Sequence, residues 1–98
     1  SGKTLSALRA EIPEYFVVRE KMTVRPEQAP VLLRGLRRQY AGHRMSFLDG
    51  VFVDLDDAWV HARRSNTEPV IRITAEAASP ERARHLADDV RRQLESMA

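Results

Sequence analysis

The stretch AWVHARRSNTEPVIRITAEA, residues 58–77, contains two β-strand patterns on either side of a polar turn. In residues 58–63 alanine and valine alternate with larger or polar side chains, and residues 70–77 alternate in the same way with branched apolar residues. A period of two is typical of a strand with one buried face. The intervening Ser-Asn-Thr-Glu-Pro run is rich in turn-forming residues. The stretch therefore predicts an antiparallel hairpin.

The alternation places two arginines on the same face of this hairpin. The apolar sets that define the buried face are Ala58, Val60 and Ala62 in the first strand and Ile71, Ile73 and Ala75 in the second. Arg63 and Arg72 then point the opposite way. A register that pairs Ala62 with Ile73 would set the two arginines directly across from each other. Like charges so placed repel unless something negative lies between them, and a bound phosphate would relieve that repulsion.

The loop and its flanks hold the donors that an oxyanion needs. Guanidinium groups offer bidentate, charge-assisted bonds to phosphate, while hydroxyl, amide and backbone N–H groups can hold the remaining oxygens. The predicted phosphate ligands are Arg63, Ser65, Asn66, Thr67 and Arg72. Two further residues are possible members of the site: Arg64, which could contact the ligand or face solvent, and Glu68, which could orient Arg63 or Arg72 or contact a sugar hydroxyl. The alternative is a solvated hairpin loop whose arginines pair with Glu68, Glu76 or Asp54.

The rest of the chain supplies two more strands and two helices. A β-branched and aromatic run predicts a strand from Tyr15 to about Val24, and alternation after Asp49-Gly50 predicts another over residues 51–55. The first helix has the apolar stripe Ala29, Leu32, Leu33, Leu36 and Tyr40, with Pro30 in its first turn and Gly42 at its end. The second begins at Ser79-Pro80 and has the stripe Ala83, Leu86, Ala87, Val90 and Leu94.

This order of strand, helix, three strands and helix predicts an α+β domain. Each helix has one apolar stripe, so each covers a sheet face. The economical arrangement is a four-stranded antiparallel sheet with two helices on one face. Residues 1–13 are expected to be a lead-in, with helical spacing from Leu5 to Ile12, and residues 14–98 to be the domain.

Composition excludes several classes of function. The 98 residues suffice for one small domain, and the absence of cysteine excludes disulfides and thiolate chemistry. No apolar run approaches the roughly 20 residues of a membrane span. The three histidines share no metal-ligand spacing, so no metal site is predicted. A net charge of +2 argues against a dedicated nucleic-acid binder. The alternative function is a free-standing basic module that binds nucleic acid or another polyanion through Arg34, Arg37, Arg38 and Arg44.

The hairpin motif resembles the C-terminal domain of the α-D-phosphohexomutases, the family of phosphomannomutases, phosphoglucomutases and phosphoglucosamine mutases. The phosphate-binding loop of that family is Arg-Pro-Ser-Asn/Gly-Thr-Glu-Pro, two residues, then Arg. The matching positions are Arg63, Ser65, Asn66, Thr67, Glu68, Pro69 and Arg72. Asp49-Gly50 and Asp57-Ala58-Trp59 resemble the family's Asp-Gly and Asp-Gly-Trp segments, and the terminal helix fits too.

One position departs from the family pattern, and another varies between the branches of the family. Arg64 stands where the family usually has Pro or Ala, and adds a third cation at the loop. Asn66, in place of Gly, is similar to the phosphomannomutase and phosphoglucomutase branches.

The resemblance implies a fold and a role. The fold is a TATA-binding-protein-like domain, the fourth of a cytoplasmic enzyme that moves a phosphoryl group within a hexose phosphate. The family's phosphoserine loop and Mg²⁺ loop belong to other domains, and neither motif occurs here. The resemblance therefore implies no cofactor in this chain, partnership with upstream domains, and no catalysis by the chain alone. The loop would hold the phosphate that is not being transferred.

Overall fold

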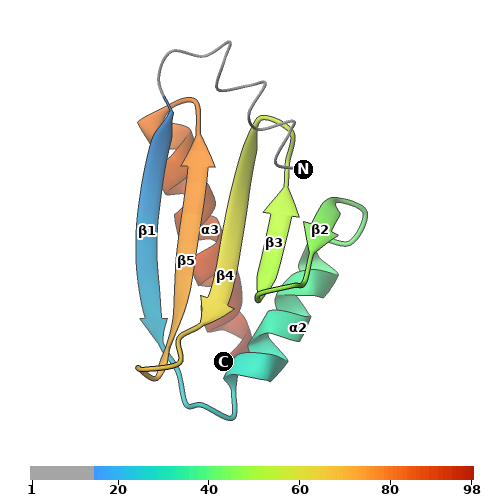
Figure 1. The fold of residues 1–98 in the computed structure, drawn as a ribbon, viewed down its shortest axis with the longest axis vertical. Coiled ribbons are helices and arrows are strands. Elements are labelled where there is room, and N and C mark those ends of the chain that lie inside the picture. Colours follow the sequence, from blue (N-terminus) through green and yellow to red (C-terminus); the bar gives the residue numbers. More distant parts are fainter. Residues whose placement is uncertain (1–14) are drawn as a thin grey trace.

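The computed structural model describes residues 15–98. Its elements in chain order are β1 (Phe16–Thr23), α2 (Ala29–Gln39), β2 (Arg44–Ser46), β3 (Val51–Asp54), β4 (Ala58–Arg64), β5 (Val70–Ala77) and α3 (Pro80–Met97). The strands form one sheet in the order β1-β5-β4-β3-β2, and every neighbouring pair is antiparallel (Figure 1). The predicted lead-in, residues 1–13, lies outside the described residues.

The predicted α+β class is confirmed, but the described sheet has five strands and not four. The additional strand, β2, pairs with β3 through Met45 opposite Val53. It was missed because three residues are too few for an alternation pattern to be recognised. The chain order is therefore strand, helix, four strands and helix, where three strands were predicted after the first helix. β2 lies at the sheet edge, so the four predicted strands remain neighbours in the sheet.

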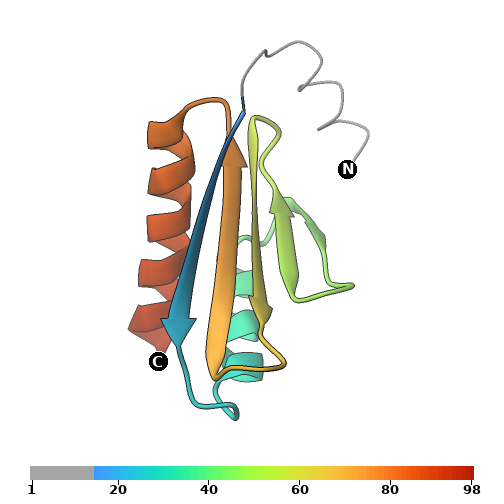
Figure 2. The same cartoon turned by 60° about the vertical axis from the view of Figure 1, so that its left-hand side comes forward.

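The core lies between one face of the sheet and the two helices. α3 runs lengthwise along the sheet, as Figure 2 shows, and packs mainly on β5 and β1. α2 packs against α3 and reaches β3 and β4. The fully buried side chains with the largest volumes come from both helices and the three central strands: Leu32, Leu36, Val53, Val60, Ile71, Ile73, Val90 and Leu94. Both predicted apolar stripes therefore face the same side of the sheet.

The start of α3 follows from its first residues. Ser79 has an extended backbone, and its Oγ accepts a hydrogen bond from the backbone N–H of Arg82 at 3.1 Å. Pro80 occupies the first turn, where its missing N–H costs nothing, and Glu81 adds a negative charge there. No helix in residues 15–98 is long and apolar enough to cross a membrane.

An ion pair network fixes α3 on the sheet. The carboxylate of Glu20 in β1 is only 9% exposed and accepts from Arg84 at 3.2 Å and from Arg91 at 3.1 Å. Its side of β1 faces the helices, so its charge needs these partners to be tolerated near the core. The pairs hold β1, which lies beside β5 of the hairpin, against the helix layer.

The register between β4 and β5 is the predicted one. Ala62 lies opposite Ile73, and Arg63 lies opposite Arg72. Ala62 and Ile73 are both fully buried under the helices, so both arginines emerge on the other, helix-free face of the sheet.

Gly50 lets the chain before β3 pass close to β4. Its φ is +75°, a conformation that side chains with a Cβ rarely adopt. A Cβ at this position would lie 2.9 Å from both Cα and Cβ of Arg63 and would also collide with the carbonyl oxygen of Ala62. Gly42 also has a positive φ, +97°, but a Cβ there would meet nothing within 4 Å.

We expect Gly50→Ala to destabilise the domain more than Gly42→Ala. Gly42→Ala carries only the cost of the backbone conformation, about 1–2 kcal/mol. Gly50→Ala adds a backbone collision at Arg63, for a total of about 3 kcal/mol or more. Urea unfolding of the two variants measures the difference. Equal losses in the free energy of unfolding would show that the close approach to Arg63 adds nothing to the cost of a side chain at Gly50.

Candidate functional site

The predicted site lies at the loop end of the β4–β5 hairpin. Its second wall is the connection from β1 to α2, because the backbone N–H of Val24 donates to the carbonyl oxygen of Pro69 at 2.8 Å. Between loop and connection is an open cavity of about 330 Å³. The lining comes from Val24 and Pro26 on one side and from residues 64–70 on the other. This volume is at the lower end of the roughly 300–1,000 Å³ of small-molecule sites.

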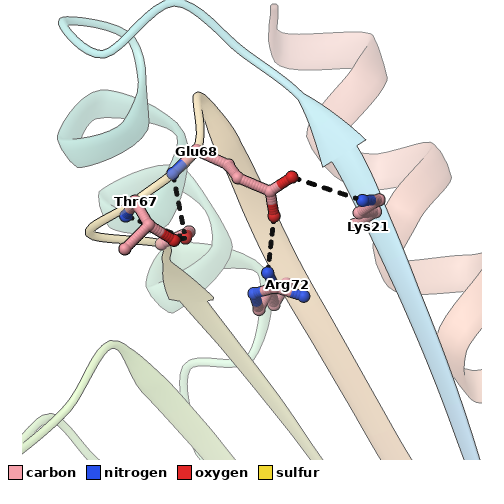
Figure 3. Close-up of polar contacts among 5 residues, drawn as sticks. Lys21, Thr67, Glu68 and Arg72 are labelled. Carbon is pink, nitrogen blue, oxygen red and sulfur yellow. Dashed lines mark hydrogen bonds and ion pairs between the residues drawn. The ribbon is translucent and has the colours of Figure 1, made fainter.

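The loop is organised around the hydroxyl group of Ser65. Ser65 Oγ accepts hydrogen bonds from the backbone N–H groups of Thr67, at 3.2 Å, and Glu68, at 3.3 Å. The hydroxyl group of Thr67 lies 3.3 Å from the same oxygen (Figure 3). The loop ends are closed by the N–H of Ser65, which donates to the carbonyl of Val70 at 3.0 Å. Three donor-capable groups therefore converge on one oxygen position.

The two facing arginines each have a carboxylate partner. Arg72 pairs with Glu68 at 2.6 Å, and Arg63 pairs with Asp49 at 3.4 Å. The solvated-loop alternative anticipated the Arg72–Glu68 pair; neither interpretation anticipated Asp49. Repulsion between the two guanidinium groups is thus offset within the chain itself, because each has an anion beside it. The repulsion between the arginines is therefore no argument for a bound phosphate.

Another anion could replace the carboxylate in both ion pairs. The side chains of Arg63 and Arg72 are 41% and 49% exposed, and such pairs contribute little to stability, typically about 0–1 kcal/mol. In addition, the Nε–H of Arg63 is buried and has no hydrogen-bond partner among residues 15–98. A buried unpaired donor is unfavourable, so an acceptor that reached this N–H would be stabilising.

The structure divides the predicted ligands into two groups. Ser65, Asn66 and Thr67 line the cavity, together with both possible members of the site, Arg64 and Glu68. Arg63 and Arg72 lie beside the cavity, on the helix-free face of the sheet. Arg64 is the last residue of β4, and its side chain is exposed. No ion pair connects it to another described residue.

Sequence reasoning missed Lys21 and Asp49. Lys21 lies opposite Arg72 in the β1–β5 pairing, and its Nζ is 3.6 Å from Oε2 of Glu68. Alternation along β1 predicts the face on which Lys21 lies. The placement of β1 beside β5, however, is a long-range pairing that local patterns do not reveal. Asp49 was used only as a turn signal, although its carboxylate reaches Arg63.

Three arginines of the alternative function, Arg34, Arg37 and Arg38, line one open cavity, whereas Arg44 lies outside it. The guanidinium of Arg37 lies 3.9 Å from the ring centroid of Phe47, a cation–π contact. Arg44 pairs with Asp54 at 3.4 Å and also contacts Asp56. These contacts match the interpretation of the arginine cluster as a solvated and partly packed surface.

The aspartates before β4 form a turn. Asp54 Oδ1 accepts from the backbone N–H of Asp56 at 2.9 Å, and Asp56 has a φ of +72°. Both features are typical of aspartate in tight turns. Within residues 15–98, no group of three or more histidine, aspartate or glutamate residues is placed to hold a metal ion.

We expect Ser65→Ala to loosen the loop without unfolding the domain. The variant removes the acceptor of the Thr67 and Glu68 N–H groups, whose amide hydrogens should exchange with solvent about tenfold faster. Global stability should fall by about 1 kcal/mol or less, since the loop is largely exposed. Hydrogen exchange followed by NMR measures both effects.

The control is Asn66→Ala, one residue along the same loop. Its side chain is exposed and makes no hydrogen bond to another residue of the described part of the chain. Exchange at Thr67 and Glu68 should then stay at the wild-type rate. Unchanged exchange in Ser65→Ala would mean that the serine hydroxyl does not organise the loop.

Comparison with known proteins places this fold and loop in one family. The sequence profile described as Phosphoglucomutase/phosphomannomutase, C-terminal domain, matches residues 8–93. The chain is 48% identical over 102 residues to a probable phosphoglucosamine mutase of Methanopyrus kandleri, covering 98% of the chain and 23% of the relative. It is 36% identical to a phosphoglucomutase/phosphomannomutase of Thermococcus kodakarensis, covering 86% of the chain and 19% of that relative.

A solved structure supports the same assignment. The crystal structure of a phosphoglucomutase/phosphomannomutase family protein from Burkholderia thailandensis superposes with a TM-score of 0.63 at 29% identity, covering 93% of this chain and 19% of the other. The chain thus spans about a fifth of the length of these proteins. The names of the relatives differ in substrate, so they do not support the branch suggested by Asn66. With its fold, its loop motif and its sequence all in agreement, the chain belongs to the phosphoglucomutase/phosphomannomutase C-terminal domain family.

Proposed function

We propose that the chain is the phosphate-holding domain of a phosphohexomutase. In this role the loop and the two facing arginines bind the phosphate of a hexose phosphate that is not being transferred. The observation that carries the proposal is the convergence of two backbone N–H groups and a hydroxyl group on the oxygen of Ser65. Such convergence, at the edge of a cavity and beside two arginines, is the arrangement that binds anion oxygens in proteins.

The loop supplies directional hydrogen bonds to the phosphate. The hydroxyl groups of Ser65 and Thr67 rotate freely and can each donate to a phosphate oxygen. The side-chain amide of Asn66, which lines the cavity, offers two more donors. Because Ser65 fixes the path of the loop, these donors are positioned before the ligand arrives, which lowers the entropic cost of binding.

The arginines supply charge. Their carboxylate partners hold the guanidinium groups at the hairpin mouth, the loop end of β4 and β5 where Arg63 and Arg72 lie. Solvent already screens these ion pairs. A phosphate dianion carries more charge than either carboxylate and can accept two parallel bonds from a guanidinium group. Replacement of each carboxylate by the phosphate is therefore favourable. In the case of Arg63 it also offers an acceptor to the buried Nε–H.

Anchoring one phosphate has a chemical purpose in a mutase. It holds the sugar so that the other oxygen can approach the phosphoryl donor, which converts an encounter into an oriented reaction. In the parent enzyme, an intramolecular phosphotransferase of carbohydrate metabolism, we assign the phosphoserine and the Mg²⁺ to upstream domains. The isolated chain then binds phosphate weakly and catalyses nothing. We place this enzyme in the cytoplasm, where phosphorylated sugars are metabolised; the absence of cysteine is compatible with a reducing compartment.

We expect hexose phosphates to perturb only the hairpin mouth of the isolated chain. In titrations with glucose 1-phosphate and mannose 1-phosphate, amide shifts should be confined to residues 63–72. Arg63→Gln should weaken binding about tenfold, because a charge-assisted contact is lost. The matched control is Arg38→Gln, which removes the same charge from an exposed position on α2 and should change affinity less than twofold.

A short DNA duplex tests the alternative function. A broad footprint over residues 34–44 with steep salt dependence would favour a polyanion-binding module. Equal losses of hexose phosphate affinity in Arg63→Gln and Arg38→Gln would contradict the proposed site, because binding would then depend only on overall charge.

A further inference from the structure

A row of three cations crosses the helix-free face of the sheet at the hairpin mouth. Lys21 in β1 lies opposite Arg72 in β5, which lies opposite Arg63 in β4. Their side chains are 57%, 49% and 41% exposed, so all three are accessible from solvent. Side chains that face each other on antiparallel strands are separated by only about 5 Å at Cβ. Lys21 therefore extends the pair of arginines in the proposed phosphate site by one strand.

One carboxylate lies between Lys21 and Arg72. Oε1 of Glu68 is 2.6 Å from a terminal nitrogen of Arg72, and Oε2 is 3.6 Å from Nζ of Lys21 (Figure 3). Each oxygen of the carboxylate thus serves a different cation. Two oxygens that bridge two cations on neighbouring strands match what two oxygens of a phosphate group would do in the same place.

The carboxylate can leave without disturbing the loop. The backbone of Glu68 is held independently, by Ser65 Oγ at its N–H and by the N–H of Val70 at its carbonyl, 2.8 Å away. Its side chain is 42% exposed, so rotation into solvent meets no core packing. Both ion pairs are solvent-screened and correspondingly weak.

We propose that Lys21 is a third cationic ligand of the phosphate monoester bound at the hairpin mouth, and that the Glu68 carboxylate occupies its place until the anion enters. This inference rests on the proposed function and adds two residue roles to it. Glu68 keeps Lys21 and Arg72 aimed at the site when it is empty. The entering dianion competes with Glu68 for the same two cations, so the glutamate lowers affinity for phosphate while keeping the site ordered.

The contrasting possibility is that the Lys21–Glu68 pair only ties β1 to the loop. Loss of Lys21 would then affect phosphate affinity no more than loss of any nearby positive charge. The chain offers a matched control in Arg19. It is exposed, lies two residues earlier on the same strand and face, pairs opposite Thr74, and makes no ion pair with another described residue.

The experiment compares Lys21→Met with Arg19→Met in the 98-residue chain. Inorganic phosphate is titrated at constant ionic strength, with chloride as the balancing anion, and the amide shifts of residues 65–68 give the affinity. We expect Lys21→Met to weaken phosphate binding about tenfold, and Arg19→Met less than twofold, because only the former loses a direct charge-assisted contact. Urea unfolding of both variants verifies that the fold is intact.

Glu68→Gln tests the competing role of the carboxylate. The amide has the same size and keeps an oxygen for Arg72, but it removes the charge that competes with phosphate. We expect about threefold tighter phosphate binding, and the gain should disappear when Lys21→Met is combined with it. Unchanged or weaker binding in Glu68→Gln would overturn the displacement of Glu68.

The outcomes separate this inference from the proposed function. If phosphate shifts no amide of residues 63–72 in the wild-type chain, the proposed function fails, and the inference fails with it. If the wild-type chain binds phosphate but Lys21→Met and Arg19→Met weaken it equally, the proposed function stands and the role of Lys21 is refuted.

Discussion

The register between β4 and β5 is the constraint on which the site depends. Ala62 and Ile73 are buried together under the helices, and this burial forces Arg63 and Arg72 to face each other on the other side of the sheet. A slip of one residue would bring the arginines under the helices and expose the apolar set, at a cost of several kcal/mol for each buried charge. The core thereby fixes the position of residues that take no part in it.

The site combines a rigid frame with weakly held charges. Strands β4 and β5 and the hydroxyl-centred loop determine where the donors lie, whereas the ion pairs of Arg63, Arg72 and Lys21 are all solvent-screened. This division suits the proposed role, in which the domain binds an anion and releases it again. Strong buried ion pairs in place of these would have made the exchange with phosphate slow and unfavourable.

The sequence predicted the hairpin and the faces of its two arginines better than it predicted their surroundings. Alternation in both strands gave the face of each arginine, and the Ser-Pro pair gave the start of α3. The edge strand β2 was missed because three residues show no period. The carboxylate partners were only partly foreseen: Glu68 is four residues from Arg72, within local reach, but Asp49 contacts Arg63 from a separate strand connection.

The sequence by itself determined the local periods, the turn chemistry and the loop motif, because these depend on neighbours within a few residues along the chain. Only the tertiary structure decided which strands lie side by side. It set β1 beside β5, which brought Lys21 to Arg72, and it let Gly50 pass against Arg63. Both contacts join segments far apart in sequence. The balance of burial over the whole core selects such contacts, and no short stretch of the chain encodes that balance.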